Sequence, residues 1–193
     1  MEKTSVQKLA GVLKLLVTIT FICNLVALFF VPGCSRLRSL DELVEGALYF
    51  SNESSLAVTA RMMGYFVSAW QEVWLFGGPY AAVLTSFLLF CGVCTAVILW
   101  QARRVLDTIL AGNTFTFENA ANMRRAAVCC FLISAAALGR TVWGLCFYRS
   151  LMPLLTYNAL FVPVFLMAGL LCMVMSALFR QAAELKAEND LTI

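Results

Sequence analysis

The sequence Cys-Gly-Val-Cys at residues 91–94 has the spacing of thiols that bind a metal or form a redox disulfide. The chain has eight cysteines and no histidine, so this pair has no imidazole to share a metal or take a proton. The pair also lies deep in an apolar stretch, where a thiolate is strongly disfavoured. Cys129 and Cys130 have similar surroundings. We therefore interpret these cysteines as small apolar packing residues and predict no metal site.

Arg140 interrupts the apolar run 126–148, and ionisable groups inside such runs are costly and often functional. Counted from Ala126, it lies about 21 Å along a helix, towards the end that we predict to be outermost. Its guanidinium could extend to the interface beside Trp143 and Tyr148. Alternatively, it closes an outer polar pocket. The partners expected for that pocket are Asn158, Tyr157 and Glu72.

The chain contains no recognisable catalytic motif. It has no histidine to act as a general base, and the GxSxG, phosphate-loop and HExxH patterns are absent from the sequence. No aspartate or glutamate lies within a core apolar run, which disfavours a proton relay of carboxylates. We predict that the protein is not an enzyme, with no catalytic residue and no cofactor.

The composition indicates a protein that lives in lipid. Apolar residues make up 62% of the 193 residues, and charged residues only 13%, about half of the roughly 25% typical of soluble domains. The mean hydropathy is +0.86. These values disfavour a soluble enzyme, a disordered chain and a nucleic-acid-binding domain, and the net charge of +3 needs no direct nucleic-acid partner.

Four uncharged or nearly uncharged runs are long enough to cross a bilayer as helices, which takes about 20 apolar residues. They predict an all-α fold, an integral membrane four-helix bundle in a single domain, with an amphipathic outer helical segment and a cytoplasmic helical extension. The predicted spans are 12–32, 79–100, 126–148 and 154–179, the outer segment is 33–78, the inner elbow is 101–125 and the tail is 180–193.

The distribution of lysine and arginine predicts that both termini are cytoplasmic, in a bacterial cytoplasmic membrane. With this orientation the inner segments carry nine cationic residues and the outer segments four. The inner ones are Lys3, Lys8, Lys14, Arg103, Arg104, Arg124, Arg125, Arg180 and Lys186.

The first apolar run has an alternative interpretation as a signal segment. It has a basic start and ends at Val31-Pro32-Gly33-Cys34, which loosely resembles a lipoprotein cleavage site. The proline departs from that pattern and the run is long, so we favour a retained first helix. Lipidation of Cys34 stays open.

The long outer segment is expected to contain structure. Ser39 and Glu42 form a capping box that predicts a short helix over about 40–50. Between Leu56 and Trp74, apolar residues recur at three- and four-residue steps, which indicates a helix on the outer surface of the membrane or capping the bundle.

The inner elbow carries local signals for the end of one helix and the start of the next. An apolar stripe continues the second helix past its span, and Gly112 is well placed to end it. Thr116 is a suitable N-cap for the helix that enters the third span, and Glu118 in its first turn suits the positive end of the helix dipole. The elbow is therefore predicted to be folded.

The elbow and the tail are the best candidates for a surface that binds a partner. The tail contains good helix formers and ends in apolar residues after an acidic cluster. These residues either contact a cytoplasmic partner or pack against the elbow, and the two are compatible. The candidate surface comprises Asn113, Phe115, Phe117, Glu118, Glu184, Glu188, Asn189, Asp190, Leu191 and Ile193.

The same two segments carry a resemblance. The stretch 110–115, Glu118-Asn119 and Met123-Arg124-Arg125, together with the closing run 188–193, resemble an uncharacterised family of small bacterial four-span membrane proteins. Members of such families are often encoded beside a small helix-turn-helix regulator. The resemblance implies a regulatory membrane partner and transfers no catalytic residue.

Three functions follow as expectations. The favoured one is a sensory or accessory protein that holds a small cytoplasmic helix-turn-helix regulator. The first alternative is a small transporter or export accessory subunit with an outer cavity around Arg140, and the second is a structural subunit that packs through small residues of the third span. Homo-oligomerisation stays open. The basic pairs are expected to contact lipid head groups as well as to fix the topology; they are Arg103, Arg104, Arg124 and Arg125.

Overall fold

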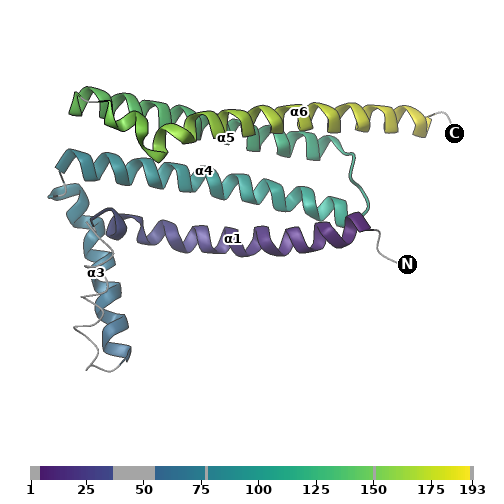
Figure 1. The fold of residues 1–193 in the computed structure, drawn as a ribbon. Helices are drawn as coiled ribbons and strands as arrows, with labels where there is room; N and C mark the ends of the chain where they lie inside the picture. Colours follow the sequence, from purple (N-terminus) through teal and green to yellow (C-terminus); the bar gives the residue numbers. More distant parts are fainter. Residues whose placement is uncertain (1–4, 37–54, 77, 150, 192–193) are drawn as a thin grey trace. The chain divides into compact units, whose positions relative to one another are not determined.

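The structure is a computed structural model that describes residues 5–36, 55–76, 78–149 and 151–191 (Figure 1). All regular secondary structure in these ranges is helical. The short helix predicted over 40–50, the side chain of Cys34 and the whole of Ile193 lie outside the described part. The elements are α1 (Ser5–Arg36), α3 (Ser55–Leu75), α4 (Gly78–Leu110), α5 (Phe117–Tyr148), the 3-10 helix η1 (Met152–Leu155) and α6 (Tyr157–Leu191).

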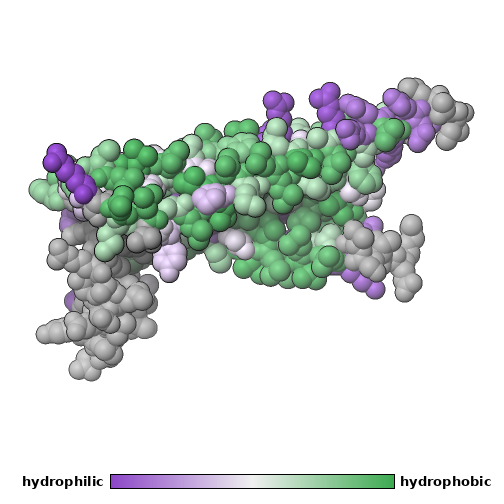
Figure 2. Space-filling model, turned by 45° about the horizontal axis from the view of Figure 1, so that its top comes forward, coloured by the Kyte–Doolittle hydropathy of each residue, from purple (hydrophilic) through white to green (hydrophobic). Residues whose placement is uncertain are grey.

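Four of these helices are long and apolar enough to cross a membrane, so the predicted all-α fold with four spanning helices is confirmed. Many apolar side chains of α6 face outwards: Leu171 is 65% exposed and Val174 is 56% exposed. Figure 2 shows a largely apolar surface, with hydrophilic side chains gathered towards the C-terminal end of the chain. Such a surface is stable in lipid rather than in water, because exposing apolar surface to water costs about 25 cal/mol per Å².

The described residues divide into two compact units, and each is described by itself. The second unit comprises residues 26–90 and includes the whole of α3. Here the Trp70 indole donates a hydrogen bond of 3.0 Å to the carbonyl of Phe29. The rings of Phe30 and Phe66 meet edge to face at 4.6 Å, and Ala69 on α3 is fully buried. The amphipathic helix predicted between Leu56 and Trp74 is thus present as α3.

The first unit comprises the chain up to residue 25 and from residue 91 onwards. Within it, α1 and α4 are joined at three levels. The Lys14 ammonium lies 2.6 Å from the Asp107 carboxylate, the rings of Phe21 and Trp100 lie 5.9 Å apart, and the Asn24 amide donates to the Gly92 carbonyl at 3.0 Å.

The pair α5 and α6 is the most extensively packed in the first unit, and the two helices lie side by side in Figure 1. A buried stripe of mostly small residues runs along α5, as is common where membrane helices pack closely. Two α5–α6 hydrogen bonds accompany the packing, from the Ser134 hydroxyl to the Val162 carbonyl (2.8 Å) and from the Ser176 hydroxyl to the Ala120 carbonyl (2.7 Å). The stripe comprises Ala126, Cys130, Ile133, Ala137, Thr141 and Gly144.

Candidate functional site

The elbow between α4 and α5 is built from the local signals in its sequence. Gly112 adopts φ +81°, the left-handed conformation that favours glycine, and its N–H donates to the Ile109 carbonyl at 3.1 Å. The N–H of Asn113 donates to the Thr108 carbonyl at 3.0 Å, which completes the hydrogen-bond pattern of a Schellman motif. At the other end, Thr116 caps α5 by accepting from the Asn119 N–H. Both predicted helix boundaries are confirmed.

Asn119 fixes the shape of this elbow. It is fully buried, and its amide nitrogen donates to the Thr108 hydroxyl on α4 at 2.7 Å and to the Thr114 carbonyl in the loop at 2.8 Å. One side chain therefore ties the end of α4, the connecting loop and the start of α5 together. Buried polar groups that are fully hydrogen-bonded in this way specify a single local structure.

Ion pairs on the surface of the elbow add to this connection. The Arg104 guanidinium on α4 lies 2.7 Å from the Glu118 carboxylate on α5, and Lys14 on α1 pairs with Asp107 on α4. Both pairs are well exposed, so each contributes only about 0–1 kcal/mol. Glu118 is consequently engaged within the chain, although sequence reasoning places it on the partner surface.

The exposed face of the elbow presents aromatic side chains beside charges. Phe115 and Phe117 are 51% and 55% exposed, and Asn113 is also exposed. The Phe115 ring lies 6.2 Å from the ring of Phe179 on α6, so the loop rests on the last apolar turn of that helix. The elbow and the base of the tail therefore form one continuous surface.

Beyond Phe179, α6 continues as a charged helix. The twelve residues from Arg180 to Leu191 correspond to about 18 Å of helix. Arg180 and Glu184 form an exposed i,i+4 ion pair at 3.0 Å, and Leu185 is 63% exposed. Glu188 and Asn189 are exposed too, whereas the side chains of Asp190 and Leu191 lie outside the described part. Leu185 projects outwards whereas Ala183 is buried, so this helix has one packed and one exposed side, and packing of the tail's apolar end on the elbow stays a prediction.

Arg140 lies on α5, where its guanidinium donates to the Asn158 amide oxygen at 2.9 Å. Asn158 is in the first turn of α6, so the bond joins the two helices. Tyr157 is 86% exposed, and Glu72 belongs to the other unit, so the pairing of Arg140 with Glu72 stays a prediction.

The four basic residues that sequence reasoning groups as lipid anchors have different surroundings. Arg104 is paired with Glu118, as described above. Arg124 and Arg125, by contrast, have no carboxylate partner among the described residues, and both border a hollow between α4 and α5. Cys94 on α4 is buried, and Cys129 on α5, which borders the same hollow, is half-buried.

Sequence reasoning missed three buried polar residues near this end of the helices. Asn119, Asn122 and Gln101 are at most 7% exposed, yet Asn119 was noted only for the family resemblance and the other two not at all. The two amide oxygens of Gln101 and Asn122, and the Asn122 amide nitrogen, have no hydrogen-bond partner in the described structure. A signal was available for the asparagines, because 119, 122, 126 and 130 recur at helical steps on the stripe that faces the neighbouring helices.

These helices, with their outward apolar side chains and polar ends, define a multi-pass membrane protein. A family model described as a protein of unknown function (DUF2975) matches residues 3–193, and the chain belongs to that family. The resemblance to an uncharacterised membrane family is thereby confirmed, while the pairing with a helix-turn-helix regulator stays a prediction. No curated protein and no solved structure matches the chain.

Proposed function

We propose that this protein is a sensory or accessory membrane protein that holds a small cytoplasmic helix-turn-helix regulator on its elbow and tail. The observation that carries the proposal is the continuous surface formed by Phe115, Phe117 and the tail. Two half-exposed aromatic side chains sit on a rigid loop beside a helix that extends about 18 Å past the apolar span.

Such a surface suits a partner for physical reasons. Exposed aromatic residues are the side chains that most often dominate binding energies at protein interfaces. Asn119 holds the loop that carries them, so little conformational entropy is lost on binding. The tail carries a small excess of negative charge, because Glu184, Glu188 and Asp190 outnumber Arg180 and Lys186, and this excess suits a basic partner such as a DNA-binding protein.

Deleting residues 181–193 is expected to reduce recovery of the proposed helix-turn-helix regulator by more than tenfold when the solubilised protein is purified. Phe117→Ala should weaken the complex by about 30-fold, the factor that corresponds to a loss of about 2 kcal/mol at an interface hot spot. The amount of copurified regulator and its affinity for the full chain are the measurements.

Phe147→Ala is the matched control, because Phe147 is equally exposed on α5 but lies at the opposite end of that helix. This variant should retain the regulator. If the chain without its tail recovers as much regulator as the full chain, the proposed role of the tail is wrong.

The transporter alternative has weaker support. Arg140 is engaged with Asn158 within the α5–α6 pair. This pairing gives the guanidinium a role in joining the two helices, and the transport alternative stays a prediction.

A further inference from the structure

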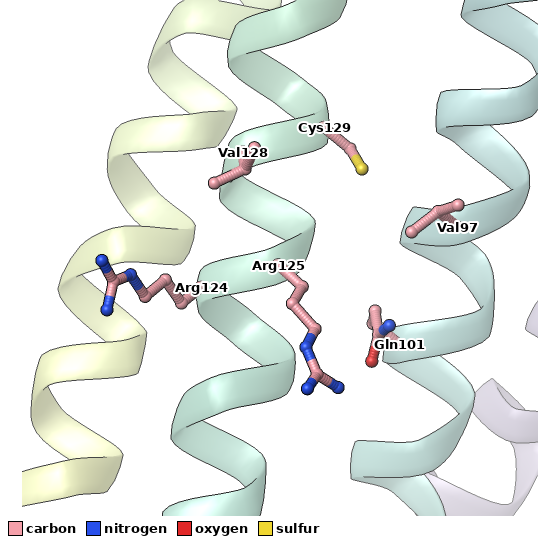
Figure 3. A pocket seen from close by; sticks show the side chains of 6 residues that line it. All are labelled: Val97, Gln101, Arg124, Arg125, Val128 and Cys129. Carbon is pink, nitrogen blue, oxygen red and sulfur yellow. The ribbon is translucent and has the colours of Figure 1, made fainter.

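A hollow of about 360 Å³ lies between α4 and α5, and we call it the α4–α5 groove. Figure 3 shows Gln101 and Arg125 at one end of it, with Val97, Val128 and Cys129 one turn further along the helices. The residues that line it are Val97, Gln101, Arg124, Arg125, Val128 and Cys129. The groove therefore has a polar, cationic end and an apolar end.

The polar end contains an acceptor without a donor. Gln101 is only 7% exposed, and its Oε1 atom has no hydrogen-bond partner in the described structure. Leaving a buried acceptor unsatisfied is unfavourable, so this atom favours an arrangement that brings it a donor. Gln101 lines the groove, and rotation of its amide group would present Oε1 to a donor held there.

The cationic side chains are also available to an outside group. Arg104 and Arg180 are paired with glutamates at 2.7 Å and 3.0 Å. Arg124 and Arg125 are exposed and have no such pair among the described residues. In Figure 3 the Arg125 side chain extends into the gap on the side of Gln101, whereas Arg124 points towards α6. An anion beside Gln101 would thus meet Arg125 first.

We propose that the α4–α5 groove binds an anionic phospholipid whose head group carries a hydroxyl, of the phosphatidylglycerol type. The phosphate contacts the guanidinium of Arg125, with Arg124 close by, and a hydroxyl of the head group donates to Gln101 Oε1. The acyl chains follow the apolar end past Val97 and Val128. This arrangement matches both ends of the groove, because a phospholipid joins an anion to an apolar chain.

The test uses native mass spectrometry of the full-length protein in detergent, with lipids of identical acyl chains added one at a time. The three lipids are phosphatidylglycerol, phosphatidylmethanol and phosphatidylethanolamine. Millimolar inorganic phosphate is added separately as a soluble competitor. Phosphatidylmethanol keeps the negative charge but lacks the hydroxyl. We expect phosphatidylglycerol to bind several-fold more tightly than phosphatidylmethanol, and phosphatidylethanolamine to bind most weakly. Inorganic phosphate should not displace the lipid.

Two variants separate the charge from the hydrogen bond. Arg125→Gln should weaken binding of phosphatidylglycerol about fivefold, as expected for loss of one charge at a membrane surface. Gln101→Leu should abolish the preference for phosphatidylglycerol over phosphatidylmethanol, and it is compatible with folding because it removes a buried unpartnered acceptor. Lys186→Gln, which removes one charge from the exposed tail, should leave binding unchanged.

Several results would overturn the proposal. Equal binding of phosphatidylglycerol and phosphatidylethanolamine would show that the groove does not select anionic lipid. Equal losses of lipid affinity in the Arg125→Gln and Lys186→Gln variants would show that Arg125 has no specific role. Equal binding of phosphatidylglycerol and phosphatidylmethanol to the unaltered chain would show that the head-group hydroxyl does not bind Gln101. Displacement of the lipid by inorganic phosphate would identify a site for a soluble anion instead.

Discussion

Replacing Asn119 with alanine is expected to lower the free energy of unfolding by about 1–3 kcal/mol, because it leaves the Thr114 carbonyl without a side-chain donor and the Thr108 hydroxyl with only its bond to the Val105 carbonyl. The amide of Asn119 serves both the Thr114 carbonyl and the Thr108 hydroxyl. Thr108 and Thr114 are half-buried, whereas the Asn119 side chain between them is fully buried, so its removal also leaves a small cavity in the elbow. Reversible unfolding of the full chain in mixed micelles measures the change.

Asn113→Ala is the matched control for this prediction. Asn113 is the same residue type in the same elbow, but it is exposed, and its hydrogen bond to the Thr108 carbonyl uses only its backbone N–H. Its replacement should change the free energy of unfolding by less than about 0.5 kcal/mol. Equal effects of the two substitutions would show that Asn119 does not fix the elbow.

Replacing Gly169 with alanine is expected to destabilise the α5–α6 pair by about 1–3 kcal/mol, the usual cost of overpacking a filled interior. A Cβ atom at Gly169 would lie 2.6 Å from Cε1 and 2.8 Å from Cδ1 of the Phe131 ring. The ring would have to move, and α5 and α6 would separate slightly. The melting temperature and the free energy of unfolding in detergent are the measurements.

Two further variants make this prediction specific. Gly139→Ala adds the same methyl group to α5 where nothing lies within 4 Å, so it should be neutral or slightly stabilising through helix propensity. In a Phe131→Leu background, Gly169→Ala should cost much less stability than it does in the unaltered chain. A double-mutant cycle measures this difference as a coupling energy. Additive effects of the two substitutions would contradict direct contact between these positions.

Local rules were sufficient to predict much of this fold. The four spanning helices follow from runs of apolar residues, which need no knowledge of their neighbours. Gly112 marks the end of α4 and Thr116 marks the start of α5. Both could be predicted because their roles depend on hydrogen bonds within five residues along the chain. Continuation of α6 past Phe179 also follows from the good helix formers in the tail.

The candidate site was harder to predict because it depends on register between helices. The pairing of Arg104 with Glu118 and the contact of Phe115 with Phe179 join positions on different elements. Sequence spacing does not determine which side of a helix meets a neighbour when nearly every side is apolar. For this reason Gln101 was passed over, although its burial and unpartnered oxygen make it central to the α4–α5 groove.

The surroundings of the basic residues also depend on contacts between helices that sequence spacing does not determine. In the sequence, Arg103-Arg104 and Arg124-Arg125 are equivalent pairs at the ends of apolar runs. In the structure, Arg104 is paired with a glutamate, whereas Arg124 and Arg125 border a groove. A common role in fixing the topology is compatible with this difference, and contact of all four residues with lipid head groups stays a prediction.

The central claim is that α6 crosses the membrane and carries its tail into the cytoplasm, where a regulator can reach it. Labelling with an impermeant thiol reagent tests it most directly, using a Cys34→Ser parent that itself should remain unlabelled. We expect Tyr157→Cys to react in intact cells and Lys186→Cys to react only after lysis, because the two exposed positions lie at opposite ends of α6. Labelling of Lys186→Cys in intact cells would contradict the account.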